Sequence, residues 1–264
     1  MIRSELPKEA QDRYGFCAVY GMRRLGKYRL TRVLAALVGP LALAACIQVQ
    51  PYLAKGVPPA TKPVRVLLMP PNVAALELTT AAAPLPRADW TELAQDSLVE
   101  AVADTLKKHG AQMIRYRRAT EVMPYAEDHL EAIALHEAVL QTILTYRYAP
   151  AQQRAALPTK PEGLDWTLGE SVTRIKTDYA ADYALFLTYR QATSTVERAL
   201  FAVVSFVLFG FIQPTSQSIG LASLVDLNTG AIIWTNLLQG QSLDVNRPDG
   251  IRDRVEQLLS GLPL

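Results

Sequence analysis

Near the C-terminus, the turn sequence Asp226-Leu-Asn-Thr-Gly230 separates two apolar segments and leaves the fold little freedom. Residues 217–227 and 231–238 are rich in β-branched and aliphatic side chains. Asp and Asn favour tight turns, and a glycine adopts a positive φ at no steric cost. The pattern therefore predicts an antiparallel hairpin, within a sheet on which the rest of the domain packs.

The remaining elements follow from apolar periodicity. Short apolar, β-rich segments predict strands, and apolar residues at helical spacing predict helices. Strands and helices in this order bury their apolar faces best in a mixed β-sheet with helices packed on it. We therefore expect an α+β fold of mixed α/β character. Besides the hairpin, strands are expected at 64–69, 112–117 and 182–191, and helices at 89–109, 127–148, 166–180 and from Pro248 onward.

Local details of two helices are also predicted. Asp89 and Glu92 have the spacing of a capping box at the start of the first helix, and the chain from residue 70 to Arg87 is expected to be a loop. Helix 127–148 is expected to bury its apolar side chains as one face. These side chains include Leu130, Ile133, Leu140 and Leu144.

The charges divide the chain into two parts. Residues 1–45 hold eight Lys and Arg against three Asp and Glu, a net charge of +5. Residues 46–264 hold 19 against 22, a net charge of −3. Nucleic-acid binding requires the opposite balance, because neutralisation of phosphates dominates such affinity. We therefore expect no nucleic-acid partner.

The N-terminal segment has the order of an export signal. Five basic residues between Arg23 and Arg32 precede the apolar run 33–45. As a helix, this run would span only about 20 Å, short of the roughly 30 Å hydrocarbon core of a bilayer. A cleaved signal peptide is therefore favoured over a membrane-spanning helix.

The end of this segment, Leu43-Ala44-Ala45-Cys46, resembles the lipobox of bacterial lipoproteins. The resemblance implies signal-peptide cleavage between Ala45 and Cys46 and a covalent lipid, with palmitate-like acyl chains, on Cys46. Two or more acyl chains give lasting membrane attachment. An ordinary signal peptide followed by a chance Cys is the alternative. Ile47, in place of Asp, implies sorting to the periplasmic face of the outer membrane, with the inner membrane as the alternative.

Four segments are therefore expected along the chain. Residues 1–21 precede the basic region and are interpreted as a start-site extension, so translation is expected to begin at Met22. Residues 22–45 are the lipoprotein signal peptide. Residues 46–63 hold the lipidated Cys and a proline-containing tether. Residues 64–264 are expected to form a single periplasmic α/β domain.

The second half of the domain carries a further resemblance. The motif Ser223-Leu-Val-Asp-Leu-Asn-Thr-Gly-Ala-Ile-Ile-Trp234, within residues 180–262, resembles uncharacterised proteobacterial lipoproteins. The α/β pattern is similar to the TolB N-terminal domain, the curli-secretion lipoprotein and the outer-membrane penicillin-binding-protein activators. The resemblance implies a fold and a compartment, and no catalytic motif comes with it.

Residues 199–212, called here the apolar segment, carry no charge. Three interpretations stay open: a buried core strand or short helix, a protruding loop that contacts a membrane or partner, and a membrane-inserting strand of a pore-like oligomer. The clean alternation of apolar and polar residues expected of a pore strand is missing. The side chains expected to contact membrane or partner are Phe201, Phe206, Phe209 and Phe211.

Residues suited to catalysis or metal binding are scarce. Two Cys and three His are too few for a disulfide scaffold or a multi-Cys zinc site. His129 and His136 lack the i and i+4 spacing of a helical metal site, so we interpret them as surface or groove histidines and expect no metal or other cofactor. Arg115 and Arg117, on one face of a strand, are candidates for contact with an anionic group. A solvated strand edge is the alternative.

These observations lead to one main functional hypothesis. We expect a non-enzymatic, lipid-anchored periplasmic protein that scaffolds or regulates a cell-envelope assembly. It would contact the membrane through its lipid, and either an envelope protein or further copies of itself. The alternatives are a subunit of an export or pore-like oligomer that uses the apolar segment, and a cryptic glycan hydrolase, which would need an acidic pair in a pocket.

Overall fold

The computed structural model describes residues 48–54, 57, 63–79, 84–117, 126–148, 165–194, 216–240 and 248–264. All of them belong to the second of two compact units, which spans Ala45–Leu264. The predicted signal peptide lies outside the described residues. So do Ala45, Cys46, Phe201, Phe206, Phe209 and Phe211.

A mixed sheet forms the centre of this unit, with the strand order β1-β8-β7-β6-β2-β5. β2 is parallel to both β5 and β6, and β3 is parallel to β6, whereas β7 and β8 join by antiparallel pairs. The expected α+β fold with a mixed sheet is confirmed. The strands are β1 (Gln48–Leu53), β2 (Arg65–Leu68), β3 (Asn72–Leu78), β4 (Leu85–Pro86), β5 (Gln112–Arg115), β6 (Tyr183–Ser194), β7 (Ser216–Asp226) and β8 (Ile232–Gly240).

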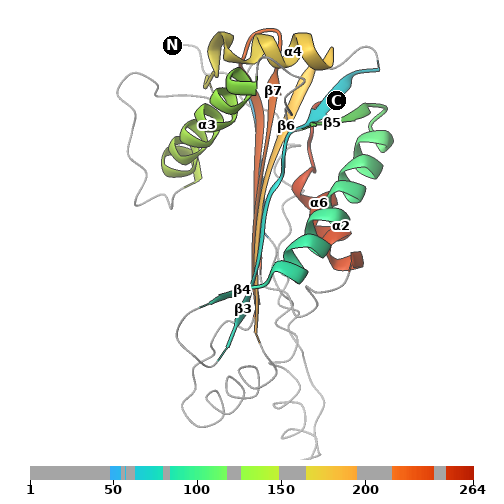
Figure 1. The fold of residues 1–264 in the computed structure, drawn as a ribbon, viewed down its shortest axis with the longest axis vertical. Helices are drawn as coiled ribbons and strands as arrows, with labels where there is room; N and C mark the ends of the chain where they lie inside the picture. The colour runs from blue at the N-terminus through green and yellow to red at the C-terminus, as the bar shows by residue number, and fades with distance from the viewer. Residues whose placement is uncertain are drawn as a thin grey trace, which may run out of the picture. The chain divides into compact units, whose positions relative to one another are not determined.

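Helices cover both faces of the sheet (Figure 1). α2 (Ala88–Lys108) and α6 (Pro248–Leu258) pack on one face, and α3 (Ala126–Ile143) and α4 (Thr173–Tyr179) pack on the other. Successive side chains of a strand point to opposite faces. On β6, Leu185 therefore joins the core under α2, whereas Phe186 joins the core under α3. A π-helical turn, Leu144–Tyr148, continues α3, and a 3-10 turn, Gly169–Val172, precedes α4.

The loop expected ahead of α2 contains a strand. β2 and β3 both lie along β6, with Leu68 opposite Leu185 and Asn72 opposite Thr188. Three residues of one strand therefore face two of the other, which is a β-bulge. Pro70-Pro71 lies in this bulge, where the ladder is interrupted and the missing N–H groups cost little. Ala and Glu weaken the strand signal of β3 in the sequence, and pairing with the long strand β6 overrides that local preference.

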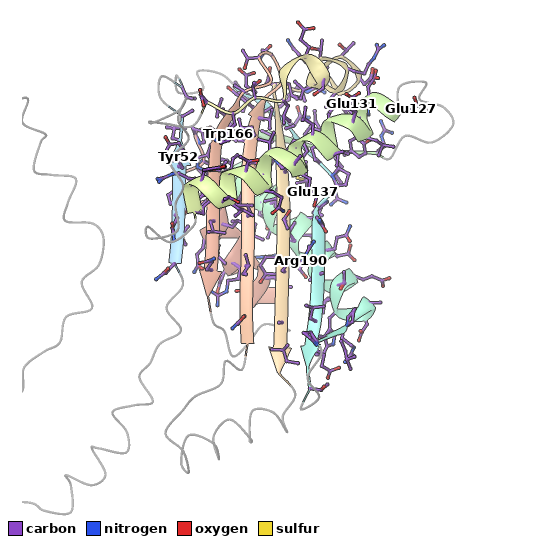
Figure 2. All side chains as sticks on the ribbon, turned by 90° about the vertical axis from the view of Figure 1, so that its left-hand side faces the viewer. Tyr52, Glu127, Glu131, Glu137, Trp166 and Arg190 are labelled. Atoms are coloured by element: carbon purple, nitrogen blue, oxygen red, sulfur yellow. The ribbon has the colours of Figure 1, made fainter. Side chains whose placement is uncertain are left out.

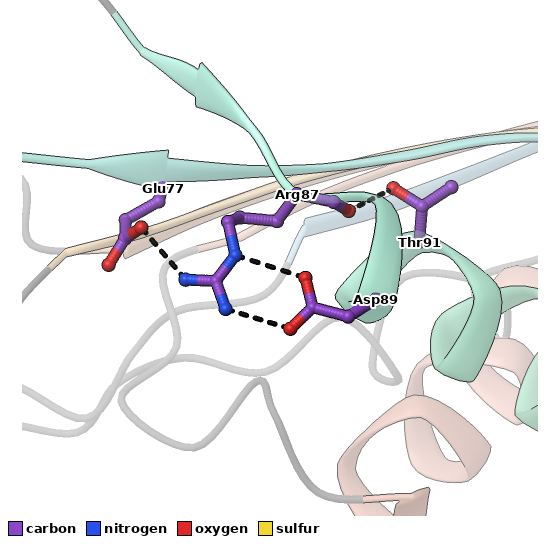
Figure 3. A network of polar contacts seen from close by, with 4 residues as sticks. All are labelled: Glu77, Arg87, Asp89 and Thr91. Carbon is purple, nitrogen blue, oxygen red and sulfur yellow. Dashed lines mark hydrogen bonds and ion pairs between the residues drawn. The ribbon is translucent and has the colours of Figure 1, made fainter.

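A polar network ties the start of α2 to β3, and the expected capping box is wrong (Figure 3). Arg87 is the N-cap, and no side chain caps the helix. Its guanidinium donates to both carboxylate oxygens of Asp89, at 3.0 and 2.7 Å, and to Glu77 at 2.9 Å. Its hydrogen bonds to Asp89 hold the pKa of that carboxyl below its ordinary value. The Thr91 hydroxyl donates to the Arg87 carbonyl at 2.7 Å and accepts the Ala75 N–H at 3.0 Å.

Residues 48–53 of the expected tether form β1, a strand at one edge of the sheet. β1 pairs antiparallel with β8, so that Gln48 lies opposite Gln239. The Ala54 N–H donates to the Ile233 carbonyl at 2.8 Å, and the alternation of an antiparallel ladder then puts Pro51 at a position that donates no ladder bond. A proline here leaves the outer edge without one donor, which discourages pairing with another chain.

Two hairpins complete the sheet. The predicted hairpin of β7 and β8 is confirmed, with Gly230 at φ +72° in the turn and its N–H donated to the Asp226 carbonyl at 2.8 Å. β6 and β7 form a second hairpin, in which Thr193 lies opposite Ser216. The apolar segment belongs to the chain that joins these two strands and lies outside the described residues.

Candidate functional site

A groove of about 660 Å³ opens beyond the carboxyl ends of β2 and β5, between α2 and α3. β5 ends at Arg115, whereas the neighbouring strand continues past Pro70-Pro71 into β3. The chain after β2 leads to α2 on one face, and the chain after β5 leads to α3 on the other. Ligands of α/β sheets bind where connections diverge in this way. We call this site the β2/β5 groove; its lining includes Asp96, Glu100, Arg115, Tyr116, Leu130 and Ile133.

The α2 wall of the groove is acidic. Asp96 and Glu100 stand one turn apart on the exposed face of the helix, and both line the groove. Leu98 and Val102, on the opposite face of the same helix, are buried in the core. Like charges at i and i+4 repel by roughly 0.2–0.5 kcal/mol in an isolated helix. The wall therefore concentrates negative charge at a small cost in stability.

The α3 wall is apolar, and it differs from the expected packing of this helix. Leu130, predicted to be a core residue, is 55% exposed and lines the groove together with Ile133. The side chains that α3 buries against the sheet include His129, Ala132, His136, Leu140 and Ile143. Because the two histidines are polar, the sequence predicts them to lie outside the buried face. The predicted face is therefore shifted by about one residue from the face that the structure buries. Figure 2 shows α3 crossing the face of the sheet, with Glu127, Glu131 and Glu137 along the helix.

The two arginines predicted to contact an anion take different places. Both are exposed, but β5 ends at Arg115, and Arg115 alone of the two lines the groove. Arg117 follows the strand, and its backbone is fixed by Tyr179. The Arg117 N–H donates to the Tyr179 hydroxyl at 3.2 Å, and that hydroxyl donates to the Arg117 carbonyl at 2.8 Å. Contact of either arginine with an anion stays a prediction.

Behind the groove, a buried histidine connects α3, α4 and the end of β5. His129 is 0% exposed, so its interpretation as a surface or groove residue is wrong. Its Nε2 lies 3.0 Å from Oδ2 of Asp178, at ion-pair distance but without the alignment of a hydrogen bond. Its Nδ1 lies 3.4 Å from the hydroxyl of Tyr116, whose ring packs on Tyr179. The arrangement fixes Tyr116, and therefore one side of the groove.

A second histidine pairs with a serine in the core. His136 Nε2 lies 2.5 Å from Ser223 Oγ, and the imidazole stacks on Phe186. A serine beside a histidine is the arrangement of an activated nucleophile. Here both side chains are buried, His136 at 5% and Ser223 at 1% exposure. The pair therefore joins α3 to the sheet, and sequence reasoning missed it because the partners are 87 residues apart.

Among the residues that the structure describes, no group of three or more His, Cys, Asp and Glu side chains is placed to hold a metal ion. None of the helices described combines the length and the apolar character needed to span a membrane.

The fold and the groove together define an α+β domain with helices on both faces of a mixed sheet and an open groove beside its parallel strands. No family model matches the chain, and no curated protein does. Among solved structures, a PelC dodecamer from Paraburkholderia phytofirmans is similar, with 11% identity and a TM-score of 0.38, over 83% of this chain and 98% of the PelC chain. A point variant of that dodecamer gives 11% identity and a TM-score of 0.36, over 82% and 99%.

These two structures are of PelC, and neither is of the TolB or curli-secretion type that the sequence analysis names. With TM-scores below one half, the likeness establishes neither a family nor a function.

Proposed function

We propose that this chain is a lipid-anchored protein on the periplasmic face of the outer membrane, which scaffolds or regulates a cell-envelope assembly without catalysing a reaction. The register of β1 carries the proposal. This register places Gln48, two residues after Cys46, at one end of the sheet. At the same end, the chain that contains the apolar segment joins β6 to β7.

The register can be followed strand by strand. Gln48 of β1 lies opposite Gln239 of β8, which lies opposite Ile219 of β7. From there, β7 reaches its first residue, Ser216, in only three further steps. Cys46 is at most about 7 Å of extended chain away from Gln48. The chain to Cys46 and the chain to the apolar segment therefore leave the described strands at the same end of the sheet, which supports one membrane-facing end.

The β2/β5 groove lies away from this end. Leu68 of the groove is paired with Leu185 of β6, and the strand continues from there to Ser194. Nine residues of strand correspond to about 30 Å at 3.3 Å per residue. If the end of the sheet that joins β6 to β7 faces the membrane, the groove is held away from the lipid surface. A periplasmic partner could then reach the groove.

The polar side chains favour binding over catalysis. The Ser223–His136 pair is buried. Asp96 and Glu100 are an acidic pair in a groove, which the hydrolase hypothesis requires, but both stand on one wall. Glycoside hydrolysis needs two carboxyl groups that flank the scissile bond. The arrangement of these two carboxylates supports a binding surface more than a hydrolase.

A subunit of an export or pore-like oligomer is the second candidate function. The position of the apolar segment between two adjacent antiparallel strands favours it, because the chain enters and leaves this segment at the same end of the sheet. Replacing residues 199–212 with a short Gly/Ser loop should abolish ring assembly if this function holds. A variant that keeps the oligomeric state of the wild type would exclude it.

The proposed anchoring is tested with two serine substitutions two residues apart. Cells that express the wild type, Cys46→Ser or Gln48→Ser, which changes an exposed residue and keeps Cys46, are labelled with an alkyne palmitate analogue and fractionated. We expect label and membrane association in the wild type and in Gln48→Ser, and neither in Cys46→Ser. Label that persists in Cys46→Ser would overturn the proposal.

A further inference from the structure

We propose that the β2/β5 groove binds a short, extended segment of a partner protein that carries basic residues on either side of an aliphatic one. This inference names the chemistry of the partner in the proposed scaffold role and rests on that role. The β2/β5 groove has a volume of about 660 Å³, which falls in the range of about 300–1,000 Å³ typical of ligand pockets. The groove is therefore matched to a few residues of chain and not to a folded surface.

The acidic wall selects positive charge. Asp96 and Glu100 belong to a row of acids on α2 with four-residue spacing, which also includes Glu92 and Asp104. Only Asp104 of this row has an ion-pair partner within the described residues, namely Arg252 at 3.8 Å. Adjacent like charges on a helix are destabilising. A lysine or arginine of the partner would relieve the repulsion between Asp96 and Glu100 on binding.

The apolar wall selects an aliphatic side chain. Leu130 is 55% exposed and has the greatest exposure among the large hydrophobic side chains described. Ile133, one turn further along α3, continues this wall, and Val99, which lies between the two acids in the sequence of α2, also lines the groove. An aliphatic residue placed between two basic ones would cover Leu130 and Ile133 while its neighbours reach the carboxylates.

The end of β5 supplies a donor for the main chain of the bound segment. Arg115 lines the groove, is exposed and forms no ion pair within the described residues, and its guanidinium carries five N–H donors. It can donate to a backbone carbonyl or to a terminal carboxylate. Pro70 and Pro71 border the same groove and carry no N–H, so they cannot donate to an added strand. Recognition therefore relies on side chains and on Arg115, not on strand addition along that edge.

Fluorescence anisotropy of labelled peptides tests the inference on the full-length protein in mild detergent. The probe is acetyl-Lys-Ala-Leu-Ala-Lys-amide. One comparison peptide replaces both Lys by Glu, and the other replaces Leu by Ser. We expect the probe to bind more tightly than either comparison peptide. Its affinity should fall with added salt, because salt screens the exposed charges. Equal binding of all three peptides would overturn the inference.

Substitutions locate the binding. The double variant Asp96→Asn/Glu100→Gln should lower the affinity for the probe roughly tenfold. Leu130→Ser should lower this affinity roughly fivefold. The matched controls are Glu137→Gln and Leu135→Ser, which change exposed residues of α3 outside the groove. Groove variants that bind the probe as tightly as the controls would overturn the assignment of the site.

Anchoring and peptide binding can fail independently. Cys46→Ser should lose its membrane association and keep its affinity for the probe. Anchored wild-type protein that does not bind the probe contradicts the groove inference alone. Cys46→Ser protein that stays at the membrane contradicts the proposed anchoring alone.

Discussion

The Nε2 atom of His136 lies 2.5 Å from the hydroxyl oxygen of Ser223, and the imidazole stacks on Phe186 with ring centroids 3.7 Å apart. The contact joins the middle of α3 to β6 and β7. Burial lowers the pKa of His136 from 6.5 to about 3, so the folded protein holds this ring neutral.

The free energy of unfolding should fall as the solution is acidified. Between about pH 6.5 and pH 3, the unfolded chain takes up a proton at His136 that the folded chain does not. The contribution of His136 to stability is therefore fully present above pH 6.5 and is lost toward pH 3, by up to about 1.4 kcal/mol per pH unit. Urea unfolding at pH 7.5 and pH 5.0 should show a loss of about 2 kcal/mol from His136.

Histidine substitutions separate this contribution from that of the acidic residues. His136→Gln keeps a partner for Ser223 but does not titrate. Its free energy of unfolding should therefore fall less between pH 7.5 and pH 5.0 than that of the wild type. His109→Gln changes an exposed histidine after α2 and should keep the wild-type loss. Equal pH dependence of His136→Gln and the wild type would show that the ring is not held neutral.

Gly230 should tolerate no side chain. Its φ is +72°, and an added Cβ would lie 2.2 Å from the Gly169 carbonyl oxygen. Gly110 has a similar φ of +73° with open space around it. We expect Gly110→Ala to cost about 1 kcal/mol from the left-handed backbone alone, and Gly230→Ala to cost more than about 3 kcal/mol. Thermal unfolding of both variants measures the difference, and similar melting temperatures would contradict the tight approach.

Thr91 should stabilise the junction between β3 and α2 through its hydroxyl. That hydroxyl bonds the Arg87 carbonyl and the Ala75 N–H at once. Thr91→Val keeps the shape and leaves both backbone groups without this partner, so we expect a loss of about 1–2 kcal/mol. Among the described residues, the Thr177 hydroxyl bonds only the Thr173 carbonyl of its own helix. Thr177→Val should therefore stay within about 0.5 kcal/mol of the wild type. Chemical denaturation that ranks the two variants in the reverse order would contradict this role.

The sequence predicts elements with strong local signals. Gly230 marks the β7–β8 turn, and the apolar spacing of α2 and α6 matches their buried faces. It misses β3, because that strand depends on pairing with the distant β6. The exposure of Leu130 is missed for a similar reason, since two buried histidines rotate α3. Among the groove residues, the sequence predicts a binding role only for Arg115, because the walls come from segments that meet only in the fold.

The size of the assembly distinguishes the two leading functions. Native mass measurement of the lipidated protein, extracted in mild detergent, should give a monomer or a small complex with one foreign protein if the scaffold role holds. A large homo-oligomer of defined size would favour the pore-like function and make the apolar segment the region to mutate.

The chemical state of Cys46 tests the central claim of membrane anchoring most directly. Mass spectrometry of the N-terminal peptide from membrane-extracted protein should find Cys46 as the first residue, with lipid on its sulfur and an acyl group on its amine. Protein in the soluble fraction with a free Cys46 thiol, or with residues 22–45 still attached, would contradict the account.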